Sequence, residues 1–296
     1  MSVREAVEAY ESLARDIFGE TKLPWQEGTF KAANLEKAIK IIVGKYDPSY
    51  RAHRAPNTVS NEDAERDGAR VLMANPAISN NRGRVFVCSL AAENPNFVTR
   101  FRTYEGRTHN IPNCGIWEAA RATSAAPKFF KPIRIPNTQN GVRYMDGGLK
   151  VNNPIQVLLA EMVQYFPYTS RVSCILSIGT GERPVIRVPK AGIFPKLQLL
   201  KFVSLLKDLA LDCQAEHERV APRFRGWYTY FRLNVDSGLE NIDLAEWENL
   251  EAVTVNTRSY MQKDAVDLEI DRVVTAIMER GRNQHLKMTV HQAAGQ

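Results

Sequence analysis

Apolar side chains recur at helical spacing in the first part of the chain. Residues 2–18 place valine, alanine, tyrosine, leucine and isoleucine on one face, and a glycine follows as a typical helix end. A second helix is predicted over residues 34–43, with Asn34 as its N-cap. Residues 47–82 are polar and interrupted by prolines, which predicts a loop with one short apolar piece at 71–73.

Further along, short apolar and alternating runs predict strands. The run at 84–90 is mostly apolar, which is typical of a strand buried on both faces of a parallel sheet. Residues 97–104 alternate between apolar and polar side chains and predict an edge strand. Three further strands are predicted at 141–145, 173–178 and 227–235, of which the second has the strongest buried pattern.

Helices are predicted between several of these strands. An alanine-rich helix covers residues 116–126 and ends before Pro127. Another helix has Pro154 in its first turn and runs to about residue 165. The order strand, helix, strand over residues 141–178 forms a βαβ unit, which places the fold in the α/β class.

A long leucine-rich helix is predicted over residues 196–220. Lysines flank its apolar stripe, a pattern that also occurs in helices lying on a membrane surface. The stripe is broad and acidic side chains oppose the lysines, so a helix packed on the sheet is the favoured interpretation. Residues from 243 onward alternate helical segments and end in a polar tail that is predicted to be frayed.

The composition of the 296 residues narrows the class of protein. Hydrophobic residues at 44% and charged residues at 24% are typical of a globular protein, and no apolar run approaches the roughly 20 residues that cross a bilayer. A net charge of +6 suits an anionic partner such as an acidic membrane surface. The basic residues are scattered, so nucleic acid is not an expected partner. Four widely spaced cysteines without a C-x-x-C pair indicate reduced thiols in an intracellular protein.

The tripeptide Asp146-Gly147-Gly148 is the most informative point for chemistry. It directly follows a predicted strand, and functional groups of open α/β sheets collect at the carboxyl ends of strands. The two glycines allow a sharp bend and leave space beside the carboxylate. Taken alone the tripeptide is weak evidence, because Asp-Gly also occurs in ordinary turns.

The sequence around Asp146-Gly147-Gly148 favours a functional motif over an ordinary turn. Three stretches occur in order: residues 117–130, which contain Ala-Thr-Ser-Ala-Ala-Pro; residues 144–155, which contain Asp-Gly-Gly and Asn-Asn-Pro; and residues 176–181, Leu-Ser-Ile-Gly-Thr-Gly. Together they resemble the patatin-like phospholipase family. The resemblance implies a three-layer sandwich with a central, mainly parallel sheet. It places a catalytic domain at residues 1–185, and residues 186–296 are expected to form a helical and strand extension packing on it.

The resemblance also implies a reaction. Members of that family hydrolyse the acyl esters of glycerolipids with a Ser–Asp dyad, in which the Asp of the D-G-[GA] motif activates the serine without a histidine. By this resemblance Asp146 is the general base, and Gly147 and Gly148 complete the motif. No cofactor, no metal and no calcium dependence are expected. The implied partner is a phospholipid or other acyl lipid, and the implied location is the cytoplasm, with peripheral contact to membranes.

The nucleophile is missing from this pattern. The chain contains no Gly-x-Ser-x-Gly and no glycine-rich oxyanion loop, and residues 2–18 correspond to a family helix that follows the nucleophile. We therefore expect that the catalytic domain lacks its N-terminal strands and that this chain is inactive, since removing a nucleophile costs on the order of a million-fold in rate.

Two other interpretations remain open. The chain could be a non-catalytic protein of the patatin fold that binds lipid or a protein partner. It could also be a hydrolase that combines Asp146 with a different nucleophile, either Ser124 or Cys114, although no matching elbow surrounds these residues.

Overall fold

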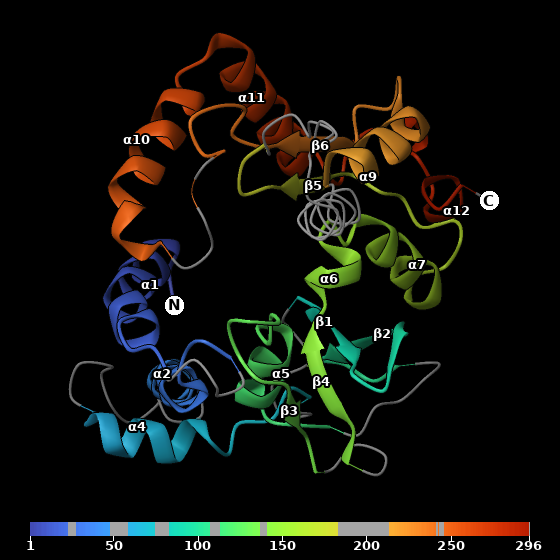
Figure 1. The fold of residues 1–296 in the computed structure, drawn as a ribbon. Helices are drawn as coiled ribbons and strands as arrows, with labels where there is room; N and C mark the ends of the chain where they lie inside the picture. Colours follow the sequence, from blue (N-terminus) through green and yellow to red (C-terminus); the bar gives the residue numbers. More distant parts are fainter. Residues whose placement is uncertain are drawn as a thin grey trace, which may run out of the picture. The chain divides into compact units, whose positions relative to one another are not determined.

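The computed structural model describes residues 1–22, 28–47, 59–74, 83–106, 113–136, 141–182, 213–240, 242 and 246–295. The chain has a mixed α/β fold (Figure 1). It divides into two compact units, Met1–Lys150 and Val151–Gln296, which are described separately. None of the helices within the described ranges is long and apolar enough to cross a membrane.

The first predicted helix is confirmed as α1, Val3–Phe18. Ser2 is its N-cap, and the side chains of Ser2 and Glu5 form a capping box. The second helix, α2, spans Ala32–Tyr46 and begins before the predicted start. The predicted cap was wrong: the side chain of Asn34 lies inside the first turn and donates to the Asp16 carbonyl oxygen at 3.1 Å, which ties α2 to α1.

A third helix, α4, spans Asn61–Gly68, where the sequence predicted only loop. Its pattern is almost entirely polar, with Ala64 and Gly68 as its buried residues, so no apolar stripe indicated a helix. The helix packs closely against α2 (Figure 1). A methyl group on Gly44 would overlap the Ala64 carbonyl, and one on Gly68 would overlap the Lys40 carbonyl. The two glycines therefore permit backbone contact between the helices.

Within the described residues of the first unit, four strands form a sheet in the order β2-β1-β4-β3. Their bounds are Phe86–Ala91 for β1, Asn94–Arg102 for β2, Ile133–Arg134 for β3 and Arg143–Asp146 for β4. The prediction that the first of these strands lies in a parallel sheet was wrong, since β1 pairs antiparallel with both β2 and β4. Only two residues connect β1 to β2, which permits a hairpin but no parallel crossover. The predicted edge position of β2 is confirmed within the sheet that the described strands form.

The second unit contains a parallel pair, β5 (Ile175–Ile178) beside β6 (Tyr230–Leu233). Helix α5, Ile116–Thr123, packs on β1 and β4 of the first unit, whereas α7, Ile155–Tyr165, belongs to the second. Because β4 and β5 pair in different sheets among the described strands, neither the predicted βαβ unit nor a single central, mainly parallel sheet is confirmed.

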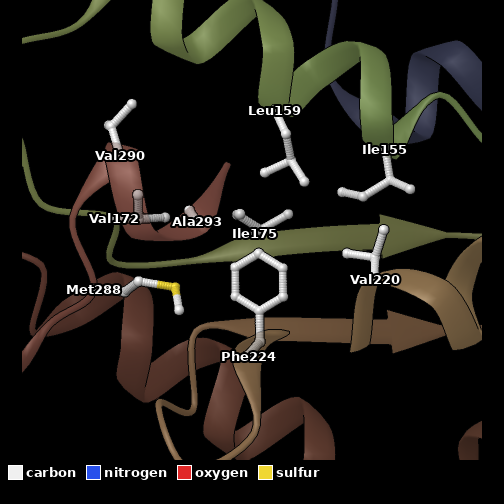
Figure 2. Packing of buried hydrophobic residues seen from close by; sticks show 9 residues of the cluster. All are labelled: Ile155, Leu159, Val172, Ile175, Val220, Phe224, Met288, Val290 and Ala293. Atoms are coloured by element: carbon white, nitrogen blue, oxygen red, sulfur yellow. The ribbon is translucent and has the colours of Figure 1, made fainter. Parts of the chain in front are cut away.

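The core of the second unit surrounds Ile175 of β5 (Figure 2). Leu159 of α7 approaches it from one side, and the ring of Phe224 approaches from the other (Figure 2). Phe224 belongs to a 3-10 helix, Ala221–Phe224, which directly follows α9, Cys213–Val220. Of the predicted helix at 196–220, α9 is the part that the structure describes; residues 196–212 lie outside the described ranges.

The remaining elements are short or lie near the C-terminus. They are α6 (Gly148–Val151), α10 (Leu250–Met261), α11 (Asp264–Met278), α12 (Val290–Ala293) and 3-10 helices at Trp247–Asn249 and Gln284–Leu286. Ala293 of α12 is fully buried and belongs to the core around Ile175, so the C-terminal part of the chain is packed rather than frayed as predicted.

The contact between α2 and α4 leads to a stability prediction. We expect Gly44→Ala to lower the free energy of unfolding by about 1–3 kcal/mol, because the added methyl must push two helix backbones apart. Gly281→Ala is the control, since its added methyl meets no atom within 4 Å. Urea denaturation measures both, and equal stability of the two variants would contradict the close packing.

Candidate active site

Asp146 is the last residue of β4, an inner strand of the four-stranded sheet. It pairs with Ser89 of β1 in the antiparallel register. Its backbone N–H donates to the Ala125 carbonyl oxygen at 3.0 Å, just beyond the end of α5. The backbone of the predicted catalytic residue is therefore fixed both by a neighbouring strand and by the segment that contains Ala-Thr-Ser-Ala-Ala-Pro.

The Asp146 carboxylate is half-buried and accepts a hydrogen bond from the Gly148 backbone N–H at 2.7 Å to Oδ1. Burial raises the pKa of this carboxyl above its usual value, and the hydrogen bond from Gly148 acts in the opposite direction. Within the described ranges no serine, cysteine or histidine side chain donates to this carboxylate. In the described part of the chain the Asp146 carboxylate is therefore partly desolvated and held by Gly148, and no nucleophilic side chain is hydrogen-bonded to it.

Gly147 is required by a close approach to β1. A methyl group at this position would overlap the carbonyl group of Cys88. The same Cys88 carbonyl oxygen accepts a hydrogen bond from Thr123 Oγ1 at 2.6 Å. The glycine after the aspartate is therefore explained by packing, since the strand end passes directly over the β1 backbone.

Small residues at the end of α5 allow this convergence. Ala119, Ala122 and Ala125 are each at most 1% exposed, so the helix lies close to β1 and β4. Ser89 Oγ, fully buried, donates to the Met145 carbonyl oxygen at 2.6 Å, and the Ala122 carbonyl oxygen lies 3.4 Å away. Sequence reasoning missed Ser89, whose hydroxyl joins β1, β4 and α5 next to Asp146.

Arg121 was also missed, although it lies in the same stretch. This α5 residue is fully buried, and its Nη2 donates to the Lys131 carbonyl oxygen at 2.5 Å. Its Nε lies 3.3 Å from Glu36 Oε1 of α2, and the guanidinium lies 5.5 Å from the centre of the Phe130 ring. Burial lowers the pKa of Arg121, while the Glu36 charge raises it. Arg121 therefore anchors α5 to α2 and to the chain that leads into β3.

The alternative nucleophiles lack the features of reactive groups. Cys114 is 2% exposed, and burial raises the pKa of its thiol to about 12, so the thiolate is strongly disfavoured at neutral pH. Ser124 is the C-cap of α5, where its backbone N–H continues the helix by donating to Ala120. Ser177, which was not among these alternatives, has a structural contact in β5 of the second unit, where its Oγ accepts a hydrogen bond from Arg232 Nη1 at 2.8 Å.

No cluster of three or more His, Cys, Asp or Glu side chains suited to holding a metal ion occurs in the described portion of the chain. The sequence profile of the patatin-like phospholipase family matches residues 2–159, and the chain belongs to that family.

Individual relatives agree with the family assignment. The chain is 32% identical over 162 residues to the 85/88 kDa calcium-independent phospholipase A2 of Rattus norvegicus, which covers 48% of this chain and 19% of that protein. It is 30% identical over 285 residues to calcium-independent phospholipase A2-gamma of Rattus norvegicus, covering 89% of this chain and 32% of the relative. Patatin-like protein 6 of Arabidopsis thaliana is 34% identical over 74 residues, 23% of this chain and 15% of that protein. The chain thus spans a third or less of the length of these relatives.

The contact at Gly147 predicts a local effect of substitution. We expect Gly147→Ala to lower the free energy of unfolding by about 1–3 kcal/mol, because the methyl group forces β4 away from the Cys88 carbonyl. Hydrogen exchange should accelerate at the Asp146 amide, whose bond to Ala125 weakens. Gly83→Ala, where the added methyl meets no atom within 4 Å, is the control. Unchanged exchange at Asp146 would rule out the proposed contact.

The raised pKa of Asp146 predicts a pH dependence of stability. The pKa of Asp146 in the folded state lies above its value in the unfolded chain, so the unfolded chain loses this proton at a lower pH. The proton therefore stabilises the folded state at low pH, and this stabilisation is lost as the pH rises through the folded-state pKa. Relative to Asp146→Asn, the wild type should therefore become less stable as pH rises from the ordinary aspartate value of 3.8 towards neutrality. Denaturant unfolding at several pH values measures the difference in stability between the wild type and Asp146→Asn. The exposed Asp16→Asn variant is the control for the loss of one negative charge. A difference that does not change with pH would show that the carboxyl is not desolvated.

Proposed function

We propose that this chain forms part of a patatin-like hydrolase that cleaves acyl esters of phospholipids or related lipids, with Asp146 as the general base of a Ser–Asp dyad. The observation that carries the proposal is the Asp146 carboxylate itself. It lies at a strand end, its backbone is fixed to Ala125, and its Oδ1 is oriented by Gly148 within a motif of the family.

The environment of Asp146 suits proton transfer. A base whose pKa is raised towards the working pH is a better proton acceptor than an ordinary aspartate. In the proposed reaction Asp146 accepts the proton of the serine hydroxyl while the serine oxygen attacks the ester carbonyl carbon. The carboxylic acid then returns the proton to the departing alcohol, and water releases the acyl group in a second, equivalent step.

We infer that the serine and the oxyanion donors come from outside these 296 residues, because Gly-x-Ser-x-Gly does not occur in the sequence. In the complete enzyme, residues 1–185 would join that segment in a three-layer catalytic domain with a central, mainly parallel sheet. Residues 186–296 would pack on the same domain. Antiparallel strands β1 to β4 would then form only part of the full sheet.

The proposed substrate is a phospholipid, and the proposed site of action is the cytoplasmic surface of membranes. Relatives are named calcium-independent phospholipase A2 and, in Caenorhabditis elegans, intracellular phospholipase A2, which supports a calcium-independent reaction inside the cell. The net charge of +6 supports attraction to anionic lipid.

The reading frame upstream of the Met1 codon provides the test. We expect it to encode a glycine-rich loop and Gly-x-Ser-x-Gly, and we expect the extended protein to hydrolyse nitrophenyl butyrate and phospholipid vesicles in the presence of a calcium chelator. Asp146→Asn in the extended protein should reduce kcat by roughly ten-thousand-fold or more. Asp16→Asn, an exposed carboxylate in α1, is the matched control and should keep full activity.

Other outcomes would contradict the proposal in different ways. Stop codons directly upstream, together with co-sedimentation of the 296-residue chain with liposomes but no turnover, would establish a non-catalytic lipid-binding protein. Esterase activity of the 296-residue chain that is abolished by Asp146→Asn would show a nucleophile within these residues, with Ser124 and Cys114 as the residues to substitute next.

A further inference from the structure

Ser89 of β1 and Asp146 of β4 lie directly opposite each other in two neighbouring strands (Figure 1). Further along the same pair of strands, the Ala92 N–H donates to the Arg143 carbonyl oxygen at 2.8 Å, which marks a hydrogen-bonded pair. Hydrogen-bonded and non-hydrogen-bonded pairs alternate in an antiparallel ladder, so Ser89 and Asp146 form a non-hydrogen-bonded pair. The side chains of such a pair are on the same face, with Cβ atoms about 5 Å apart. The Ser89 hydroxyl is therefore a close neighbour of the Asp146 carboxylate.

The Ser89 hydroxyl nevertheless donates away from that carboxylate. A bond to the carboxylate would be charge-assisted and strong, yet none is formed. Ser89 Oγ donates instead to the Met145 carbonyl oxygen at 2.6 Å, and the Ala122 carbonyl oxygen is a second acceptor at 3.4 Å. A hydroxyl has one proton, so the bond to Met145 leaves none for Asp146. Ser89 is fully buried, so bulk water does not compete for this bond.

The two oxygens of the Asp146 carboxylate have different surroundings. Oδ1 accepts the Gly148 N–H at 2.7 Å and is oriented by it. Oδ2 accepts no hydrogen bond within the described ranges, and it is not one of the fully enclosed atoms of that part of the chain. The carboxylate is thus fixed through one oxygen and able to accept a proton on the other.

The charged side chains of the surrounding elements are engaged elsewhere. Strand β1 carries none, and Glu118 of α5 accepts from the Gly115 N–H at the other end of that helix. The cations of α5, β4 and α6 each have an acceptor of their own, in the pairs Arg121–Glu36, Arg143–Glu93 and Lys150–Asn96. Burial raises the pKa of Asp146 and the Gly148 bond lowers it. The hydrogen-bond donors around the carboxylate therefore determine how strong a base it is.

We propose that Ser89 is a positioning residue for the candidate base: its hydroxyl holds the end of β4 through the Met145 carbonyl and keeps a water molecule out of the same place. A water there has two protons and can donate to the Met145 carbonyl and to the Asp146 carboxylate together. Serine provides the first bond without the second, so the anion stays poorly solvated and accepts a proton readily. This role rests on the proposed function of Asp146 as a base.

Carbon-13 NMR titration of the aspartate carboxyl groups tests the arrangement in the 296-residue chain, without any turnover. Asp146→Asn identifies the signal by removing it. In Ser89→Ala we expect the pKa of Asp146 to fall towards the ordinary aspartate value of 3.8, because water replaces the hydroxyl and donates to the carboxylate. Ser89→Thr keeps a hydroxyl with one proton and suits a strand, so it should titrate as the wild type does.

Ser60→Ala is the matched control for stability. It is the same substitution in the same unit, and it removes the hydroxyl that caps α4 by accepting from the Asp63 N–H at 3.1 Å. Loss of this cap lowers the stability of the fold without touching β1 or β4. The titration of Asp146 should therefore be unchanged in Ser60→Ala.

The extended protein that contains the nucleophile provides the second measurement. Ser89→Ala should lower kcat by roughly 10- to 100-fold, because the base is misplaced and weakened. KM should stay as in the wild type, since the fully buried Ser89 does not reach the substrate. The acid limb of the kcat profile should move to lower pH together with the Asp146 titration, and Ser89→Thr should restore both.

Three results would overturn the proposal: an Asp146 titration that Ser89→Ala leaves unchanged, the same shift in Ser89→Ala and Ser60→Ala, or a shifted titration with an unchanged kcat. If Ser89→Ala does not fold, Ser89→Thr decides, and an ordinary aspartate titration in that variant would contradict the role of the hydroxyl. An extended protein without hydrolytic activity would contradict the proposed function alone, because the titration does not depend on turnover.

Discussion

The first unit depends on the close approach of three backbone segments around the Cys88 carbonyl. The end of β4 passes over it at Gly147, and Thr123 at the end of α5 donates a hydrogen bond to it. Ser89, one residue further along β1, closes the same junction through the Met145 carbonyl. A larger residue at Gly147 would separate the segments, and the hydrogen bonds between them would then be exchanged for bonds to water. The position of Asp146 is a consequence of this packing.

That packing also determines the chemistry available to the carboxylate. Strand pairing with Ser89 and the bond to Ala125 leave Asp146 little freedom, so its charge stays in a partly desolvated place. Desolvation raises its pKa, and the hydrogen bond from Gly148, the one that the carboxylate accepts among the described residues, offsets only part of the effect. A carboxylate with several donors would be a more stable anion and a weaker base. The sparse hydrogen bonding of Asp146 is therefore consistent with a role in accepting protons.

Much of the local structure was predictable, because it depends on local signals. The first helix had periodicity and a serine cap, and Asp146 was found from its neighbours in sequence. The predictions that failed concerned features that the pattern of apolar residues does not record. Helix α4 has almost no apolar residues and is held by glycine contacts to α2, and the direction of β1 follows from a two-residue connection that an apolar run does not reveal. Ser89 and Arg121 looked like ordinary strand and helix residues, since only the folded structure buries them.

The charged groups inside the two units are each compensated only in part. Arg121 has a carboxylate at 3.3 Å, a carbonyl oxygen and an aromatic ring, but its Nη1 has no hydrogen-bond partner among the described residues. Arg232 donates to the Ser177 hydroxyl, and its Nε likewise has no hydrogen-bond partner within the described ranges. Desolvating a charge without a full set of partners costs free energy, which the packing of the surrounding residues must offset. An unpartnered donor therefore also occurs in residues that support the fold, and it does not by itself mark a binding site.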